Sequence, residues 1–137
     1  MHLMKNFLIT ALLASLWAAP AFALEAPEIS DEEAGRVGRL IWHNESRSTL
    51  EGLTSWNQGE EFASLGIAHT IWFPEGYSGP FQESFPLMLD YLAKHGAAIP
   101  EWLAQSPHCP WSTREEFLAE RNGPRMRELR ELLARTV

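Results

Sequence analysis

The sequence predicts an α+β domain with an N-terminal helix, a small antiparallel β hairpin and then several helices. Three observations predict this fold class. Residues 31–45 show a capped amphipathic helical pattern, and residues 62–73 are rich in β-branched and aromatic side chains. Helical spacing of apolar residues then returns after residue 84. Strands and helices that occupy separate parts of the chain are typical of α+β domains.

The first helix is predicted from its start signal and its periodicity. Ser30 and Glu33 have the spacing of a capping box, in which each residue satisfies a backbone N–H of the other. The helix is expected to end near Asn44 or Glu45. Apolar side chains recur every three or four residues along it, at Ala34, Val37, Leu40 and Ile41.

The hairpin is predicted over residues 62–73, around Gly66, and a loop rich in glycine and proline follows at residues 74–80. An apolar stripe after residue 84 predicts a helix that Gly96 ends. Pro100 is expected to open a short helix.

Two further helices are predicted near the end of the chain. A second capping box, Ser112 with Glu115, is expected to begin the first, and Pro124 the second. No stop signal follows Val137, so the last helix is expected either to continue in a longer chain or to fray there.

Residues 1–23 are expected to be a cleavable signal peptide. Lys5 precedes an uncharged, mostly apolar run over residues 7–19, Pro20 interrupts it, and Ala21-Phe22-Ala23 has the small-x-small cleavage pattern. The apolar run is short for a transmembrane helix. We therefore expect an exported, periplasmic or secreted protein that has no membrane contact after cleavage, with one domain over residues 24–137.

Composition excludes several classes of function. The formal net charge of −7 argues against binding of nucleic acid or anionic lipid, both of which attract basic surfaces. Cys109, the single cysteine, cannot form an internal disulfide and is expected to be buried as a small apolar residue, rather than to act as a catalytic thiol.

No metal or cofactor is predicted. The string His43-Asn44-Glu45 fits the first half of a zinc deaminase signature, but the Pro-Cys-x-x-Cys half is missing. A zinc site would require three dispersed histidines, His43, His69 and His108, to converge. Phosphate-binding glycine loops are also missing from the sequence.

Glu45 is the first candidate for a catalytic group. It lies at the predicted end of the first helix, where the negative end of the helix dipole favours a protonated carboxyl group, and Trp42 is close enough in sequence to shield it from water. A protonated carboxyl group is what a general acid needs. The alternative reading is a solvated glutamate at a helix end.

The segment that follows resembles phage-type lysozymes and endolysins. In that family a catalytic glutamate ends the first helix, and a hairpin then carries an acid and a Thr-x-Gly-x-Gly-His segment. This chain has Ser64-Leu65-Gly66-Ile67-Ala68-His69 at that place, with Ala68 in place of the second glycine. Asn57 stands near the position of the acid, and Glu60 is a carboxylate close by. A second register starts at Glu51, which makes Glu51 an alternative acid.

This resemblance implies a lysozyme-like fold and an exported glycosidase that acts on peptidoglycan. Glu45 would protonate the leaving oxygen, Glu60 would stabilise the oxocarbenium-like centre or activate water, and Ser64 would position that water. Four residues are expected to line or support the substrate site, although core packing is an alternative for the aromatic ones: Trp56, Asn57, His69 and Trp72.

Two other functions are open from the sequence. The departures from the lysozyme pattern favour a non-catalytic exported domain that binds a saccharide or a partner. A third hypothesis is a partner-binding module in which Trp102 and Trp111 form an exposed apolar patch.

Overall fold

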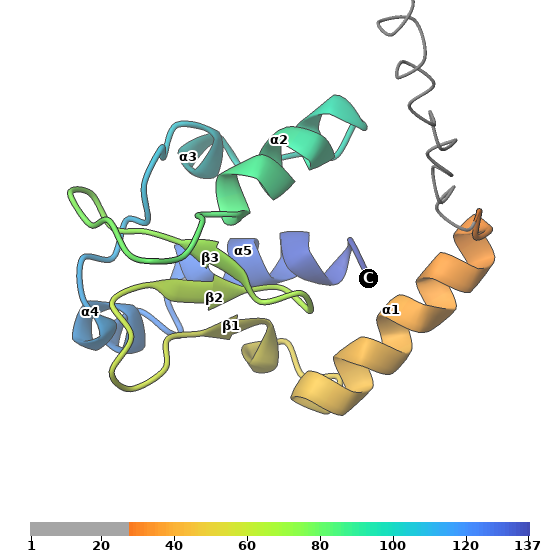
Figure 1. The fold of residues 1–137 in the computed structure, drawn as a ribbon, viewed down its shortest axis with the longest axis horizontal. Coiled ribbons are helices and arrows are strands. Elements are labelled where there is room, and N and C mark those ends of the chain that lie inside the picture. Colours follow the sequence, from red (N-terminus) through yellow and green to blue (C-terminus); the bar gives the residue numbers. More distant parts are fainter. Residues whose placement is uncertain (1–27) are drawn as a thin grey trace, which may run out of the picture.

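A computed structural model describes residues 28–137, so the predicted signal peptide lies outside the described residues. These residues form an α+β structure with five α-helices, one short 3-10 helix and a three-stranded antiparallel sheet (Figure 1). The predicted α+β class is therefore confirmed. Within residues 28–137, no helix combines the length and the apolar character needed to cross a membrane.

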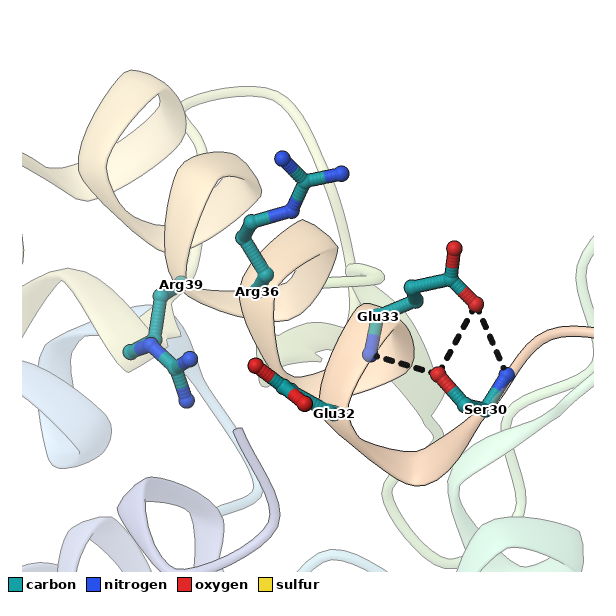
Figure 2. Close-up of a pocket in the computed structure, with 5 residues that line it drawn as sticks. All are labelled: Ser30, Glu32, Glu33, Arg36 and Arg39. Carbon is teal, nitrogen blue, oxygen red and sulfur yellow. Dashed lines mark hydrogen bonds between the residues drawn. The ribbon is translucent and has the colours of Figure 1, made fainter.

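Helix α1 (Asp31–Ser46) forms where the sequence predicts it. The Ser30 backbone N–H donates to Glu33 Oε2 at 3.0 Å, and the Glu33 backbone N–H donates to Ser30 Oγ at 3.3 Å (Figure 2). The predicted capping box is thus present. Arg47 ends the helix in a left-handed conformation with φ of 51°.

The apolar side of α1 is less buried than its amphipathic pattern leads one to expect. Val37, Leu40 and Ile41 are 45%, 57% and 39% exposed. The helix lies at the edge of the molecule (Figure 1), and Trp42 is the α1 residue that packs against the core. A Cβ atom at Gly38 would be 3.6 Å from the Val137 backbone, so α1 approaches the body along its glycine side instead.

The sheet is a meander in the order β1-β2-β3. Strands β2 (Ala63–Leu65) and β3 (Thr70–Trp72) form the predicted hairpin. Strand β1 (Thr54–Ser55), which follows the 3-10 helix η1 (Glu51–Leu53), pairs with β2 through Ser55 and Ser64. The sequence did not reveal β1, because two residues are too few to show strand periodicity.

Four helices follow the sheet, and their order agrees with the sequence. They are α2 (Phe85–Lys94), α3 (Glu101–Ala104), α4 (Arg114–Ala119) and α5 (Pro124–Ala134). The second capping box was predicted wrongly. Thr113, not Ser112, is the N-cap of α4, and its hydroxyl accepts from the Glu116 N–H. The Ser112 N–H donates instead to the Glu116 carboxylate, which moves the helix start one residue along the chain.

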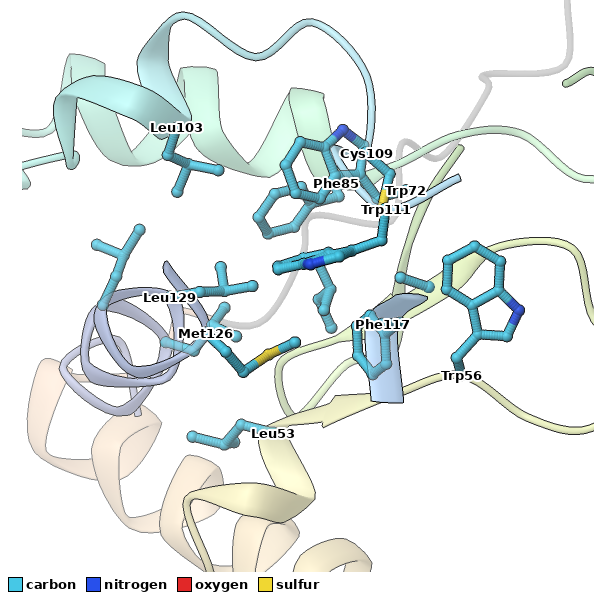
Figure 3. Close-up of a cluster of buried hydrophobic side chains, with 14 residues drawn as sticks. Leu53, Trp56, Trp72, Phe85, Leu103, Cys109, Trp111, Phe117, Met126 and Leu129 are labelled. Carbon is cyan, nitrogen blue, oxygen red and sulfur yellow. The ribbon is translucent and has the colours of Figure 1, made fainter. Parts of the chain in front are cut away.

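The core lies where the sheet meets α2, α4 and α5. Its largest completely buried side chains include Trp72, Phe85 and Phe117 (Figure 3). Cys109 is buried here as predicted, and its backbone N–H donates to the Phe73 carbonyl at 2.8 Å. Burial raises the pKa of the Cys109 thiol to about 12, so the thiol stays protonated at neutral pH and is unsuited to nucleophilic chemistry.

Candidate functional site

Glu45 and His69 are brought together at one side of the molecule. Glu45 Oε2 lies 3.7 Å from His69 Nε2, and the two side chains are 54% and 51% exposed. His69 has φ of 50° in the β2–β3 turn, where its backbone N–H donates to the Gly66 carbonyl. We call this pair, together with the exposed apolar side of α1, the α1 corner. Its carboxylate and imidazole both face water, so Glu45 is a solvated residue at a helix end.

Glu60 and Asn57 lie elsewhere, in the loop between β1 and β2. The Asn57 side-chain amide donates to Glu60 Oε2 at 3.0 Å, and the Trp56 indole N–H donates to the Glu60 carbonyl at 2.7 Å. This loop and the β2–β3 turn are at opposite ends of β2 (Figure 1). Glu45, which lies beside His69 of the turn, and Glu60 are therefore near opposite ends of β2.

Three of the predicted site residues are buried. Ser64 is 7% exposed in the middle strand, and Trp56 is 4% exposed, with its ring 5.8 Å from that of Phe117. Trp72 is completely buried and its indole N–H has no hydrogen-bond partner within the described part of the chain. Trp72 is thus a core residue that offers no surface to a saccharide, and this corrects its predicted role in substrate binding.

A shallow pocket of about 450 Å³ lies between η1, β1, α4, the segment after α4 and the middle of α5. It contains two residues that the sequence singled out, Glu51 and Trp56. We call it the arginine pocket, because two arginines line it. Its lining residues are Glu51, Thr54, Ser55, Trp56, Phe117, Leu118, Arg121, Asn122 and Arg130.

Arg130 is the best-fixed polar residue of the arginine pocket. It is 8% exposed, its Nε–H donates to Thr54 Oγ1 at 2.8 Å, and an Nη1–H donates to the Arg121 carbonyl at 2.8 Å. Burial lowers the pKa of the Arg130 guanidinium, and the carboxylate of Glu51 acts in the opposite direction. These two hydrogen bonds connect α5 to β1 and to the segment after α4.

Arg114 extends this cluster of arginines. Its Nε–H donates to the Trp56 carbonyl at 2.9 Å, which connects α4 to the residue that follows β1. Together with the contact between the Trp56 and Phe117 rings, this bond fixes the wall of the pocket. The arginine pocket is therefore assembled by segments that are distant in sequence.

The sequence reasoning missed Thr54, Ser55, Arg121 and Arg130. One feature of the pattern does point to Arg130. It lies four residues after Met126 and three before Leu133, and so on the apolar side of α5, where a charged residue is unusual. Arg121 lies between two helices without a local motif that distinguishes it.

A second depression lies along the first turns of α1 and is lined by Ser30, Glu32, Glu33, Arg36 and Arg39 (Figure 2). All five residues come from one exposed helix and its cap. The Ser30 backbone and hydroxyl donate hydrogen bonds that lower the pKa of Glu33, so this carboxylate already serves as a cap. We therefore take the arginine pocket as the candidate site.

Other predicted features are placed clearly by the structure. Within residues 28–137, no three histidine, cysteine, aspartate or glutamate side chains are close enough to hold a metal ion. Trp111 is 3% exposed and Trp102 is half-buried, with its indole N–H donating to Glu128 Oε2 at 2.8 Å. These two tryptophans do not form the exposed patch that the third hypothesis required.

Comparison of the chain with known protein families, with curated proteins and with solved structures found no match.

Proposed function

We propose that this protein is an exported, lysozyme-like glycoside hydrolase that acts on peptidoglycan, with Glu51 as its general acid. One observation carries the choice of acid. Of the three candidate carboxyl groups, on Glu45, Glu51 and Glu60, only that of Glu51 lines the arginine pocket. The proposal therefore takes the second register of the lysozyme resemblance.

The chemistry requires one proton to move from the enzyme and back. The Glu51 carboxyl group would protonate the glycosidic oxygen as the bond from that oxygen to the anomeric carbon breaks. A water molecule would then add to the oxocarbenium-like carbon. The proton that this water loses would restore the acid form of Glu51, so that hydrolysis is the net reaction.

The order of the elements also supports this proposal. A capped helix is followed by a small antiparallel sheet and then by further helices, as the resemblance to phage-type lysozymes implies. The segment from Ser64 to His69 covers the end of β2 and the β2–β3 turn, in agreement with the hairpin position of the family's motif.

The test is release of new reducing ends from purified peptidoglycan sacculi by the chain of residues 24–137. Glu51→Gln removes the acid with almost no change in shape, so we expect a loss of at least about 100-fold, in the range typical of general acid catalysis. Glu45→Gln and Glu60→Gln are matched controls, because each makes the same chemical change outside the pocket lining.

Two results would count against this assignment. Full activity in Glu51→Gln together with loss in Glu45→Gln would return the acid to the α1 corner. No release by parent protein with a cooperative unfolding transition would argue against a hydrolase altogether.

A non-catalytic saccharide-binding domain is the second candidate, and a specific observation favours it. Glu51 supplies the only carboxyl group among the described residues that line the arginine pocket, while Asn57 holds the Glu60 carboxylate in the β1–β2 loop. A glycosidase usually needs a second carboxylate. A binding domain would sediment with sacculi and leave the number of reducing ends unchanged.

A further inference from the structure

The arginine pocket is a cationic spot in an acidic protein. The chain has a formal net charge of −7, yet the pocket lining contains two arginines, Arg121 and Arg130, and one carboxylate, that of Glu51. Arg114 lies nearby, bonded to the Trp56 carbonyl. A local excess of positive charge attracts anions even when the protein as a whole repels them.

The buried arginine makes no close ion pair, although the Glu51 carboxylate is near enough to act against the lowering of its pKa. Within the described part of the chain, no carboxylate oxygen comes within 4.0 Å of the Arg130 nitrogens, and the acceptors it has are the neutral Thr54 hydroxyl and Arg121 carbonyl. A buried guanidinium that is bonded only to neutral groups is costly unless an anion approaches it. Because Arg130 is one of the residues that line the arginine pocket, an anion would approach it from the pocket.

The rest of the lining suits a saccharide that carries the anion. The Arg121 side chain is exposed, and its guanidinium makes no hydrogen bond or ion pair with the residues that the structure describes. The Asn122 side chain offers groups for sugar hydroxyls, the Ser55 hydroxyl can still accept while it donates to the Ser64 carbonyl, and the exposed Leu118 supplies an apolar wall. A neutral sugar would use the polar groups and the apolar wall, but it has no carboxylate to pair with Arg121.

We propose that the arginine pocket selects saccharides that carry a carboxylate, with the guanidinium groups of Arg121 and Arg130 as its receptors. A guanidinium presents parallel N–H groups that match the two oxygens of a carboxylate. This inference rests on the proposed function only in taking the ligand to be a saccharide. It does not require that the pocket hydrolyses the ligand.

The test compares two monosaccharides that differ in the carboxylate, N-acetylmuramic acid and N-acetylglucosamine, by NMR titration of the chain of residues 24–137. We expect N-acetylmuramic acid to bind about tenfold more tightly, because a charge-assisted hydrogen bond contributes on this order. The preference is expected to weaken as salt concentration rises.

Variants connect this preference to the pocket. Arg121→Gln is the main variant, since Arg121 is exposed and its side chain supports no other residue; we expect it to remove most of the preference. Arg135→Gln is the matched control, because Arg135 is an exposed arginine at the end of α5, outside the pocket lining. Arg130→Lys keeps the charge but loses the forked geometry, and should reduce the preference to about half or less.

Each outcome either supports or overturns the inference. Equal binding of the two sugars, no binding of N-acetylmuramic acid at about 10 mM, or an unchanged preference in Arg121→Gln would overturn it. Release of reducing ends without a carboxylate preference would leave the proposed function standing and remove this inference. A clear preference for the carboxylate without hydrolysis would support this inference and count against the proposed hydrolase.

Discussion

The α1 corner and the arginine pocket contrast in how they are built. In the α1 corner, the end of α1 and the β2–β3 turn bring Glu45 and His69 within 3.7 Å, but both side chains remain about half exposed. In the arginine pocket, Arg130 is 8% exposed and bonds to Thr54, which is 76 residues earlier in the chain. The corner thus carries the residues with the clearest sequence pattern, whereas the shallow pocket contains one buried arginine that is fixed by hydrogen bonds to distant segments.

The largest expected change in the free energy of unfolding comes from substitution of Arg130 in the pocket. Arg130→Met keeps much of the apolar stem but leaves the Thr54 hydroxyl and the Arg121 carbonyl without this donor, so we expect a loss of about 2 kcal/mol in the free energy of unfolding. Urea denaturation would measure it. Arg135→Met is the control, because Arg135 is exposed at the C-terminal end of α5, and should change the free energy by less than about 0.5 kcal/mol. Equal effects of the two variants would remove the contrast between buried and exposed arginines.

An intermediate effect is expected on the pH dependence of stability, because of the buried thiol of Cys109 in the core. Burial raises the pKa of the thiol from its ordinary value of 9.0 to about 12 in the folded state, so above pH 9 the unfolded chain loses a proton that the folded chain keeps. The contribution of the thiol to stability should therefore be complete below about pH 8 and fall as the pH rises towards 12, by about 1.4 kcal/mol at pH 10.

The matched measurement is the same series of unfolding curves on Cys109→Ala. This variant is less stable at every pH because it leaves a small cavity, but it should lack the extra alkaline loss. An identical pH dependence in both proteins would mean that water reaches the thiol, and that the core is as open as the α1 corner.

The smallest effect is expected at the α1 corner. His69→Asn removes the imidazole and retains a residue that tolerates the left-handed conformation of the turn. Because exposed ion pairs contribute little, we expect a change below about 0.5 kcal/mol in the free energy of unfolding. Comparison with Glu45→Gln and with the double variant would give the coupling energy of the pair. A coupling above about 1 kcal/mol would show that the α1 corner is organised more firmly than its exposure suggests.

Much of the fold could be read from local patterns. The capping box of α1, the hairpin of β2 and β3 and the start of α5 at Pro124 each depend on residues that are close in sequence. The errors have local causes too. Strand β1 is too short to show a period, and Ser112 and Thr113 are both competent caps, so the backbone bond to Glu116 decided between them.

The candidate site was far less predictable. Glu51 and Trp56 were identified from the sequence, but Glu45 was preferred because it ends the first helix. Both glutamate side chains are exposed, and the pattern cannot show that Glu51, unlike Glu45, borders a pocket with Arg130. Trp72 illustrates the same limit, because an aromatic residue next to polar residues has the same sequence signature in a core and in a cleft.

The sequence by itself determined the fold class, the ends of α1 and the burial of Cys109, because caps, periodicity and apolar character act over a few residues. Only the tertiary structure decided which carboxyl group borders a pocket and which tryptophans are buried. Those outcomes depend on contacts such as that between Arg130 and Thr54, which form once β1, α4 and α5 have packed together. A local sequence pattern does not show which distant residue a side chain will contact, and the geometry of this candidate site depends on such contacts.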